Sequence, residues 1–254
     1  KQPGIELANE IEVHGSDIKS NKSCVSEVGT KISVKNLFFN IPARKNFLKS
    51  DKIELKHIIE TFIQIALSHH HINFQFTNDG KQLYSLSTEN FKNRIIQLFG
   101  RRYKQKILQI KEQTTIVEID GFLGNPLDAK KTRGEQYLFV NNRFIRSPYL
   151  NHAIKESVAD LIQTDQHPSY FIFLNIDSQY IDVNVHPNKT EVKFEDEKSI
   201  YQILKSACKR TIGMSNLKPS LDFSIEKNIK NIADSKNKDL TQLTACILDR
   251  PRHS

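Results

Sequence analysis

Apolar residues recur at helical spacing in several segments, and each such segment predicts a helix that buries one face. The predicted helices run over residues 52–68, over residues 91–99 up to Gly100, and from the Ser147-Pro148 cap to Leu161. A last helix is predicted to end before Gly213, with Ile200, Ile203, Leu204 and Ala207 facing inward. The first helix carries one apolar stripe, which is formed by Leu55, Ile58, Ile59, Phe62 and Ala66. Asp51 with Glu54 three residues later is typical of a helix start.

Alternation of apolar and polar residues predicts the strands. These lie at residues 11–13, 31–39, 72–77, 82–87, 115–123, 136–146, 170–176, 181–186 and 192–194. Asn78-Asp79-Gly80 and Asn141-Asn142 tolerate positive φ angles, so each is expected to close a tight hairpin. Pro42 cannot donate to a sheet ladder and is expected to end the strand before it. This order of elements favours an α+β fold over a regular βα alternation.

The composition is that of a globular protein, with 254 residues of which 38% are hydrophobic and 26% charged. No apolar run approaches the ~18 residues that span a bilayer, and no signal-peptide pattern is present. We therefore expect no membrane association and a cytoplasmic location. Cys24, Cys208 and Cys246 are far apart without metal-ligand spacing, which favours inert thiols in a reducing compartment. The first residue is Lys rather than Met, which favours a piece of a longer protein.

Positive charge is concentrated in three segments of a chain whose net charge is +8 and whose pI is near 9.2. Residues 31–50 contain Lys and Arg but no acid. Residues 91–113 and 129–146 are also rich in Lys and Arg, and each contains a single acid, Glu112 or Glu135. Such clusters suit binding to a polyanion, and they equally suit a solvated basic surface.

Lys189 lies at the tip of a predicted turn within IDVNVHPNKTEVKF, residues 181–194. Strands on both sides and Pro187 are expected to stiffen this turn. An ammonium on a stiff turn acts as a point charge for a phosphate, whereas an ordinary turn lysine is only solvated. Both interpretations fit the local sequence.

Three stretches, in this order and spacing, resemble the N-terminal region of the MutL family of DNA mismatch repair proteins. They are GTKISVKNLFFNIPARKNFLKS at residues 29–50, YLFVNNRFIRS at 137–147 with NHAI at 151–154, and IDVNVHPNKTEVKF at 181–194. The similarity covers roughly residues 5–212. The motif Asn-Leu-Phe-Phe-Asn-x-Pro-Ala-Arg, followed at this distance by Val-Asn-Val-His-Pro-x-Lys-x-Glu-Val, is highly specific.

The resemblance implies a split ATPase of the GHKL type with an α+β fold. Residues 1–88 are expected to be the C-terminal part of the ATPase α/β sandwich, with its lid, helix and hairpin. Residues 89–213 are expected to form a transducer domain of the type seen in a ribosomal protein and in the second domain of gyrase B. Residues 214–254 are polar without a steady apolar period, which predicts a flexible linker.

The family resemblance also implies a matchmaker ATPase that couples ATP binding and hydrolysis to dimerisation, DNA binding and signalling from the mismatch recognition factor. The general-base Glu, the magnesium-holding Asn and the adenine-site Asp-x-Gly of the family have no candidates here, so we expect them upstream. ATP and magnesium are thus expected to act in the full-length protein, with no catalytic residue and no bound cofactor in this chain. The implied partners are DNA, the recognition protein MutS, a second copy of the protein, and a downstream endonuclease and helicase at the nucleoid.

The resemblance assigns nucleotide contacts to three residues. Lys189 is expected to meet the ATP γ-phosphate and to sense its loss on hydrolysis. Gly29 allows close backbone approach and the hydroxyl of Thr30 can bond a phosphate, although a plain loop-to-strand junction also fits this pair. Residues expected to line a DNA-binding groove are Arg143, Arg146, Arg101, Arg102, Lys104, Lys130, Lys131 and Arg133. Tyr149 departs from the family pattern, because some relatives carry a basic residue there.

Two other functions fit parts of the sequence. A non-enzymatic nucleic-acid-binding module of the same fold explains the pI but gives no role to Lys189 or Gly29-Thr30. A topoisomerase ATPase subunit would carry Gln-x-Lys where this chain has Pro187-Asn188-Lys189. The adjacent His69, His70 and His71 favour a helix C-terminal cap over a metal site, because neighbouring side chains on a helix end cannot converge on one ion.

Overall fold

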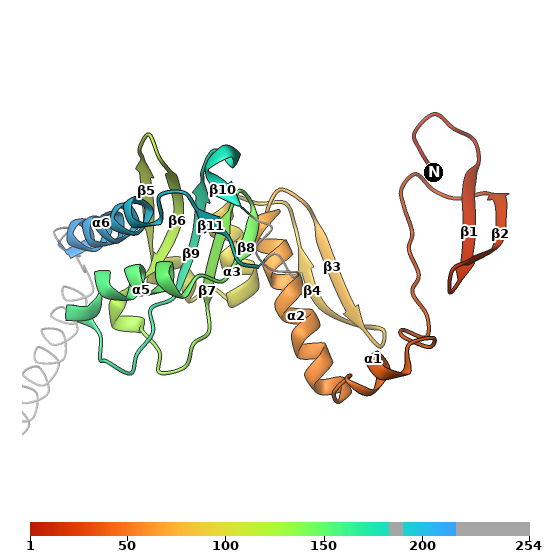
Figure 1. The fold of residues 1–254 in the computed structure, drawn as a ribbon, viewed down its shortest axis with the longest axis horizontal. Coiled ribbons are helices and arrows are strands. Elements are labelled where there is room, and N and C mark those ends of the chain that lie inside the picture. Colours follow the sequence, from red (N-terminus) through yellow and green to blue (C-terminus); the bar gives the residue numbers. More distant parts are fainter. Residues whose placement is uncertain (183–189, 217–254) are drawn as a thin grey trace, which may run out of the picture. The chain divides into compact units, whose positions relative to one another are not determined.

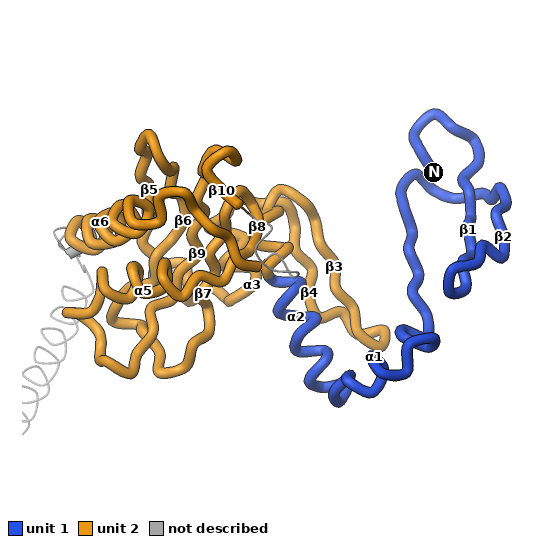
Figure 2. Tube along the Cα trace, viewed as in Figure 1, with its two compact units in different colours: residues 1–63 blue, residues 64–254 orange. Residues whose placement is uncertain are grey.

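The computed structural model describes residues 1–182 and 190–216, and the chain divides into two compact units (Figure 1). The first unit covers residues 1–63 and the second covers residues 64–254 (Figure 2). This division follows the compactness of the backbone and does not test the functional border expected after residue 88, which stays a prediction. Within the described residues, no helix has both the length and the apolar character needed to cross a bilayer.

The first unit contains a β-hairpin and two helices. β1 (Ala8–His14) pairs antiparallel with β2 (Asp17–Cys24). α1 (Pro42–Asn46) is short, and α2 (Asp51–Ser68) begins in this unit and continues into the second. The carboxylate of Glu54 accepts the backbone N–H of Lys49 at 2.9 Å, which satisfies a donor at the helix start. The strand predicted at residues 11–13 and the helix predicted at 52–68 are therefore confirmed.

The strand predicted over residues 31–39 is wrong. Residues 31–35 belong to no helix or strand, and Asn36 and Phe38 turn the chain with φ angles of 51° and 63°. Ile32 and Val34 are 82% and 74% exposed. A strand exists only as one side of a hydrogen-bonded ladder, and alternation along one segment cannot supply the partner. Pro42 accordingly does not end a strand but begins α1, where its missing N–H is not needed.

The second unit opens with the predicted hairpin. β3 (Phe74–Asn78) and β4 (Lys81–Leu86) pair antiparallel across a two-residue turn. Asp79 and Gly80 have φ angles of 48° and 75°, and two consecutive positive values give the twist that a tight hairpin needs. The turn sequence alone therefore located this hairpin correctly.

A five-stranded sheet forms the centre of the second unit, in the order β5-β6-β9-β7-β8. Its strands are β5 (Ile107–Gln113), β6 (Glu118–Gly124), β7 (Gln136–Val140), β8 (Arg143–Ile145) and β9 (Tyr170–Asn175). Only β7 and β9 pair in parallel; the other neighbours are antiparallel. β5 was not predicted, because the adjacent Ile107 and Leu108 break the strict alternation. The β7–β8 turn was predicted, and Asn141 and Asn142 have φ angles of 48° and 65°.

Helices cover both faces of this sheet (Figure 1). α5 (Pro148–Ser157) and α6 (Glu197–Asn216) pack on one face, where Tyr170, Ile172 and Leu174 of β9 join their core. α3 (Phe91–Phe99) covers the other face, where its terminal rings meet Phe173 and Phe171 at centroid distances of 4.9 and 5.2 Å. The uninterrupted apolar run of β9 thus reflects burial on both faces. The α+β class predicted from the sequence is confirmed.

The predicted starts of α3 and α5 are confirmed, but the predicted ends of α5 and α6 are wrong. Ser147 caps α5 by accepting the backbone N–H of Leu150 at 3.1 Å, and Asn90 caps α3. Leu161, expected inside α5, lies beyond it in the short helix η2 (Ala159–Leu161) and is 46% exposed. α6 runs through Gly213 rather than stopping before it, because one helical glycine is tolerated at a cost of about 1 kcal/mol. The buried Ile212 holds this last part against the core.

Short elements complete the second unit. α4 (Tyr103–Lys106) follows α3, and η1 (Pro126–Asp128) follows β6. η3 (Ser178–Tyr180) leads into β10 (Ile181–Asp182), which pairs antiparallel with β11 (Lys193–Phe194). The predicted hairpin at residues 181–194 is confirmed at these paired ends, whereas its tip lies outside the described residues.

Gly121 sets the closest backbone approach in the sheet. Its φ angle is 148°, and an added Cβ would lie 2.2 Å from the carbonyl oxygen of Phe171. We expect Gly121→Ala to lower the free energy of unfolding by roughly 2–5 kcal/mol, through backbone strain and overpacking together. Chemical denaturation of the chain measures this. Gly213→Ala is the matched control, because it adds a methyl to a helix where no atom lies within 4 Å, and it should stabilise by about 0.5–1 kcal/mol. Equal effects of the two substitutions would contradict this account of the sheet.

Candidate functional site

The residues predicted to contact DNA all lie in the second unit, on three segments around one end and one edge of the sheet. They occupy the α3–α4 connection and α4 (Arg101, Arg102, Lys104), the loop before β7 (Lys130, Lys131, Arg133), and β8 with the residue after it (Arg143, Arg146). We call these residues the basic set. All are exposed except Lys130, which is half-buried.

Glu135 joins two of these segments. Nζ of Lys130 donates to both carboxylate oxygens of Glu135, at 2.6 and 2.8 Å. The guanidinium of Arg102 lies 4.0 Å from the same carboxylate. The side chain of Glu135 is only 15% exposed. The hydroxyl of Tyr103 also bonds this carboxylate. Burial raises the pKa of Glu135, but the hydrogen bonds from Lys130 and Tyr103 outweigh burial, so the pKa falls below its ordinary value. Glu135 therefore organises the basic set while cancelling part of its charge.

Ion pairing separates the basic set into two groups. Lys131 pairs with Asp165 at 3.0 Å, and Lys130 and Arg102 face Glu135. Among the described residues, no carboxylate lies within 4.0 Å of the remaining members, which are Arg101, Lys104, Arg133, Arg143 and Arg146. These five have full charge available for a phosphate backbone.

The β7–β8 hairpin sets the spacing of the last two arginines. Arg143 pairs with Val140 at the turn, whereas Arg146 follows Ile145, which pairs with Leu138. At about 3.3 Å per residue, the two Cα atoms are about 10 Å apart along the strand direction. Arg146 therefore lies toward the end of the sheet where β7 begins, and Arg143 toward the opposite end.

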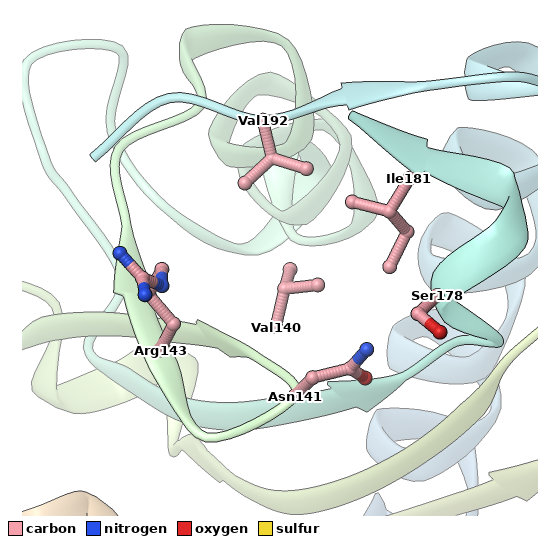
Figure 3. Close-up of a pocket in the computed structure, with 6 residues that line it drawn as sticks. All are labelled: Val140, Asn141, Arg143, Ser178, Ile181 and Val192. Carbon is pink, nitrogen blue, oxygen red and sulfur yellow. The ribbon is translucent and has the colours of Figure 1, made fainter. Parts of the chain in front are cut away.

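Arg143 borders a small cavity of about 110 Å³ (Figure 3). The side chains of Val140, Ile181 and Val192 point into it. Asn141 at its rim is fully engaged, because its amide donates to the carbonyl of Ile176 at 2.8 Å and accepts that residue's N–H at 3.0 Å. The cavity is mainly apolar and offers one cationic side chain.

Lys189, the predicted γ-phosphate contact, lies outside the described residues, as do Pro187 and Asn188. The chain on both sides of residues 183–189 is held to the second unit. Ile181 pairs with Phe194, and the carbonyl of Thr190 accepts the backbone N–H of Arg146 at 2.8 Å. The described residues on both sides, Ile181 and Thr190, are therefore fixed to the fold, and Thr190 is bonded to Arg146 of the basic set.

Gly29 and Thr30 lie in the first unit, in an exposed stretch between β2 and α1 that belongs to no helix or strand. Gly29 has a φ angle of 135°, which favours glycine, and the space where a Cβ would lie is open. Its N–H donates to the carbonyl of Lys1 at 2.9 Å. The junction is thus accessible but is not followed by the predicted strand.

Two histidines at the end of α2 contact backbone carbonyls, and the ring of His69 also contacts the hydroxyl of Ser68 at 2.8 Å. Nδ1 of His69 contacts the carbonyl of Ile65 at 3.3 Å, and Nδ1 of His70 contacts the carbonyl of Glu89 at 2.9 Å. Within the described residues, no three His, Cys, Asp or Glu side chains are placed to share a metal ion. The capping role predicted for the histidines fits the His69 contact at the helix end.

Two organising residues escaped the sequence analysis. Arg94 is fully buried beneath the β3–β4 hairpin, although it lies on the same helical stripe as Phe91, Ile95 and Leu98. That position, a charge on an apolar stripe, was the available signal. Glu135 is the single acid of a basic segment, and its burial depends on Tyr103 and Lys130, which lie elsewhere in the sequence or across the loop. Only the folded chain brings these groups together.

Comparison with known proteins relates the chain to DNA mismatch repair. A family model described as DNA mismatch repair protein, C-terminal domain, matches residues 95–213. The chain is 47% identical to the DNA mismatch repair protein MutL of Christiangramia forsetii, over 92% of this chain and 38% of the relative. It is 46% identical to MutL of Flavobacterium psychrophilum, over 94% of this chain and 39% of that protein. The chain thus spans about two fifths of the length of these relatives.

Solved structures support the fold. The N-terminal domain of a DNA repair protein matches with a TM-score of 0.71 at 21% identity, over 84% of this chain and 70% of that one. The ATPase domain of Aquifex aeolicus MutL matches with a TM-score of 0.61 at 19% identity, over 81% of this chain and 72% of that one. The same domain complexed with ADP gives 0.53 at 22% identity, over 68% and 63%. The described fold is therefore that of a region of the MutL ATPase domain, as the sequence predicted.

Glu135 supplies a pH-dependent test of the site. We expect Glu135→Gln to lower the free energy of unfolding by about 1.5–3 kcal/mol at neutral pH, because a carboxylate with charge-assisted bonds is lost. The folded-state pKa lies below the ordinary value of 4.5, so this stabilisation is complete above about pH 4.5 and is lost as pH falls through the lowered value. Denaturation at several pH values should show the two chains converging in acid. The exposed Glu195→Gln is the control and should stay within about 0.5 kcal/mol of wild type. A difference that persisted at pH 2 would refute the ionic account.

Proposed function

Because the chain belongs to the MutL family of DNA mismatch repair proteins, we propose that it forms the lid-and-transducer part of a mismatch repair ATPase. The observation that carries this proposal is 47% identity to a MutL protein over 92% of the chain. In the complete protein, this part couples ATP binding and hydrolysis to dimerisation, DNA binding and signalling from the mismatch recognition factor. Residues 1–88 belong to the ATPase domain and residues 89–213 form the transducer domain in this proposal.

The proposal includes the cofactor and partners of the complete protein. ATP with magnesium is the nucleotide, which the ADP complex of the Aquifex aeolicus domain supports by analogy. The partners are DNA, MutS, a second copy of the protein, and an endonuclease and helicase that act downstream. The site of action is the bacterial cytoplasm at the nucleoid, in line with the bacterial source of the relatives.

Gly29 and Thr30 fit a nucleotide contact in this proposal. The positive φ of Gly29 and the open space at its Cβ position allow a phosphate to approach the backbone closely. The exposed Thr30 has a hydroxyl that can donate to a phosphate oxygen. A bound magnesium ion neutralises phosphate charge in such a site.

Lys189 acts in this proposal as the cation that meets the γ-phosphate. Its ammonium stabilises charge on the transferred phosphoryl group, and its contact is lost after hydrolysis. The anchoring of the chain at Thr190 and at the Ile181–Phe194 pair supports the role, because a sensor must transmit force to the fold that carries it.

The unpaired members of the basic set bind the DNA backbone in this proposal. Arg101, Lys104, Arg133, Arg143 and Arg146 contact phosphates without reading sequence. Lys130, Lys131 and Arg102 contribute less, because carboxylates already compensate their charge.

The nucleotide role is tested by Lys189→Ala in the full-length protein. We expect the turnover number for ATP to fall about 100-fold, since one preorganised donor to the transition state is removed. The protein should stay folded, because the sequence predicts this residue at the tip of a turn. Lys193→Ala, at an exposed position of β11, is the control and should keep wild-type turnover. Steady-state phosphate release measures both, and unchanged turnover in Lys189→Ala would exclude the sensor.

The DNA role is tested by Arg101→Ala and Arg146→Ala. Each should reduce the slope of log Kobs against log salt by about 0.9 for duplex DNA, because one phosphate contact is lost. Fluorescence anisotropy over a salt series measures the slope. Lys198→Ala removes the same charge from the exposed start of α6 and should leave the slope unchanged. Equal slopes for all the proteins would show that these arginines do not touch DNA.

A further inference from the structure

Arg94 is the only charged side chain that is buried within the described residues, with 0% of its surface exposed. It projects from the first turns of α3 toward the base of the β3–β4 hairpin. Its Nη2 lies within hydrogen-bonding distance of three backbone carbonyls, at 2.9 Å from His70, 2.7 Å from Ile72 and 3.1 Å from Ser87. The guanidinium also lies 5.5 Å from the ring centre of Phe74. One nitrogen of Arg94 thus contacts the backbone of three residues.

These three carbonyls mark the two ends of one module. His70 and Ile72 follow the end of α2 and precede β3, whereas Ser87 directly follows β4. Arg94 itself belongs to α3, which is held to the five-stranded sheet through Phe91 and Phe99. The guanidinium therefore ties the entry and the exit of the hairpin to the helix that covers the sheet. A shift of either end changes the length of at least one bond to Nη2.

Filling the space beneath the hairpin does not by itself require a charged side chain at residue 94. Nε and Nη1 of Arg94 are buried without a hydrogen-bond partner, and no carboxylate forms an ion pair with it among the described residues. Burial lowers the pKa of Arg94 and the nearby charge of Glu89 only partly opposes this. A buried charge with incomplete partners carries a desolvation cost that an apolar side chain of similar size would avoid. Its presence here indicates a requirement other than packing.

We propose that Arg94 is a positioning residue that transmits the nucleotide state between residues 1–88 and the sheet domain that carries Lys189. This inference rests on the proposed function. Because Arg94 touches neither nucleotide nor DNA in the proposal, it acts only through the angle at which α3 meets the hairpin. Loss of that fixed angle misplaces the sensor without removing a nucleotide contact, and small misplacements of a reacting group slow catalysis strongly.

Two substitutions in the full-length protein separate positioning from folding. Arg94→Met keeps an unbranched chain of similar reach and removes the charge and the donors. Arg94→Lys keeps the charge but cannot reproduce the planar guanidinium fork. Lys92→Met, on the same helix but half-buried, is the matched control for loss of a cation. For each protein we would measure thermal unfolding, and the turnover number and KM for ATP per folded molecule.

We expect Arg94→Met to remain folded, with KM for ATP within about threefold of wild type and the turnover number at least tenfold lower. Arg94→Lys should be intermediate, and Lys92→Met should match wild type. Folded variants with wild-type turnover would overturn the inference, and so would failure of both Arg94 variants to fold, because Arg94 would then be a folding determinant. Absence of ATP turnover in the wild-type protein would instead overturn the proposed function, so the two failures are distinguishable.

Discussion

The second unit depends on how one buried cation is solvated. A guanidinium removed from water must find acceptors, and Arg94 finds them in backbone carbonyls just after α2 and just after β4. Nη2 therefore supplies donors to these carbonyls, whereas Nε and Nη1 of the same guanidinium stay without a partner among the described residues. Aromatic rings on α3 then fix the same helix to the sheet. Polar contacts thus link the hairpin to α3, with His70 bonded to Glu89 and Gln97 bonded to Ser87 beside the Arg94 bonds.

A similar balance governs the surface. A chain with a net charge of +8 contains many cationic side chains, but the fold determines which of them lie close to a carboxylate. Glu135 and Asp165 engage Lys130 and Lys131, whereas Arg101 and Arg146 face the solvent without a carboxylate nearby in the described residues. The Glu135 network also fixes the loop before β7 against α4, through Tyr103. The positive potential that could attract DNA therefore depends on where the acidic side chains lie as much as on the number of Lys and Arg residues.

Features set by a few neighbouring residues were predictable from the sequence. Gly80 adopts a positive φ because it has no Cβ, and Asp79, Asn141 and Asn142 do so because Asp and Asn tolerate this region. Ser147 caps α5 because its hydroxyl accepts a backbone N–H of the first turn. The family motifs identified the relationship that comparison confirmed, since they are short patterns that do not require the fold to be known. Boundaries were less well predicted, as Leu161 and Gly213 show, because the stability of a last turn depends on what it packs against.

The sequence by itself determined the turns, the caps, the class of fold and the family, because each is encoded by local backbone preferences or by contiguous motifs. Tertiary structure alone decided which alternating segments find a partner strand: residues 31–39 do not, whereas the less regular β5 does. It also decided the burial of Arg94 and the pairing of Glu135. Hydrogen-bond partners, desolvation and ion pairs are properties of groups brought together from distant positions, and no single segment of the chain contains them.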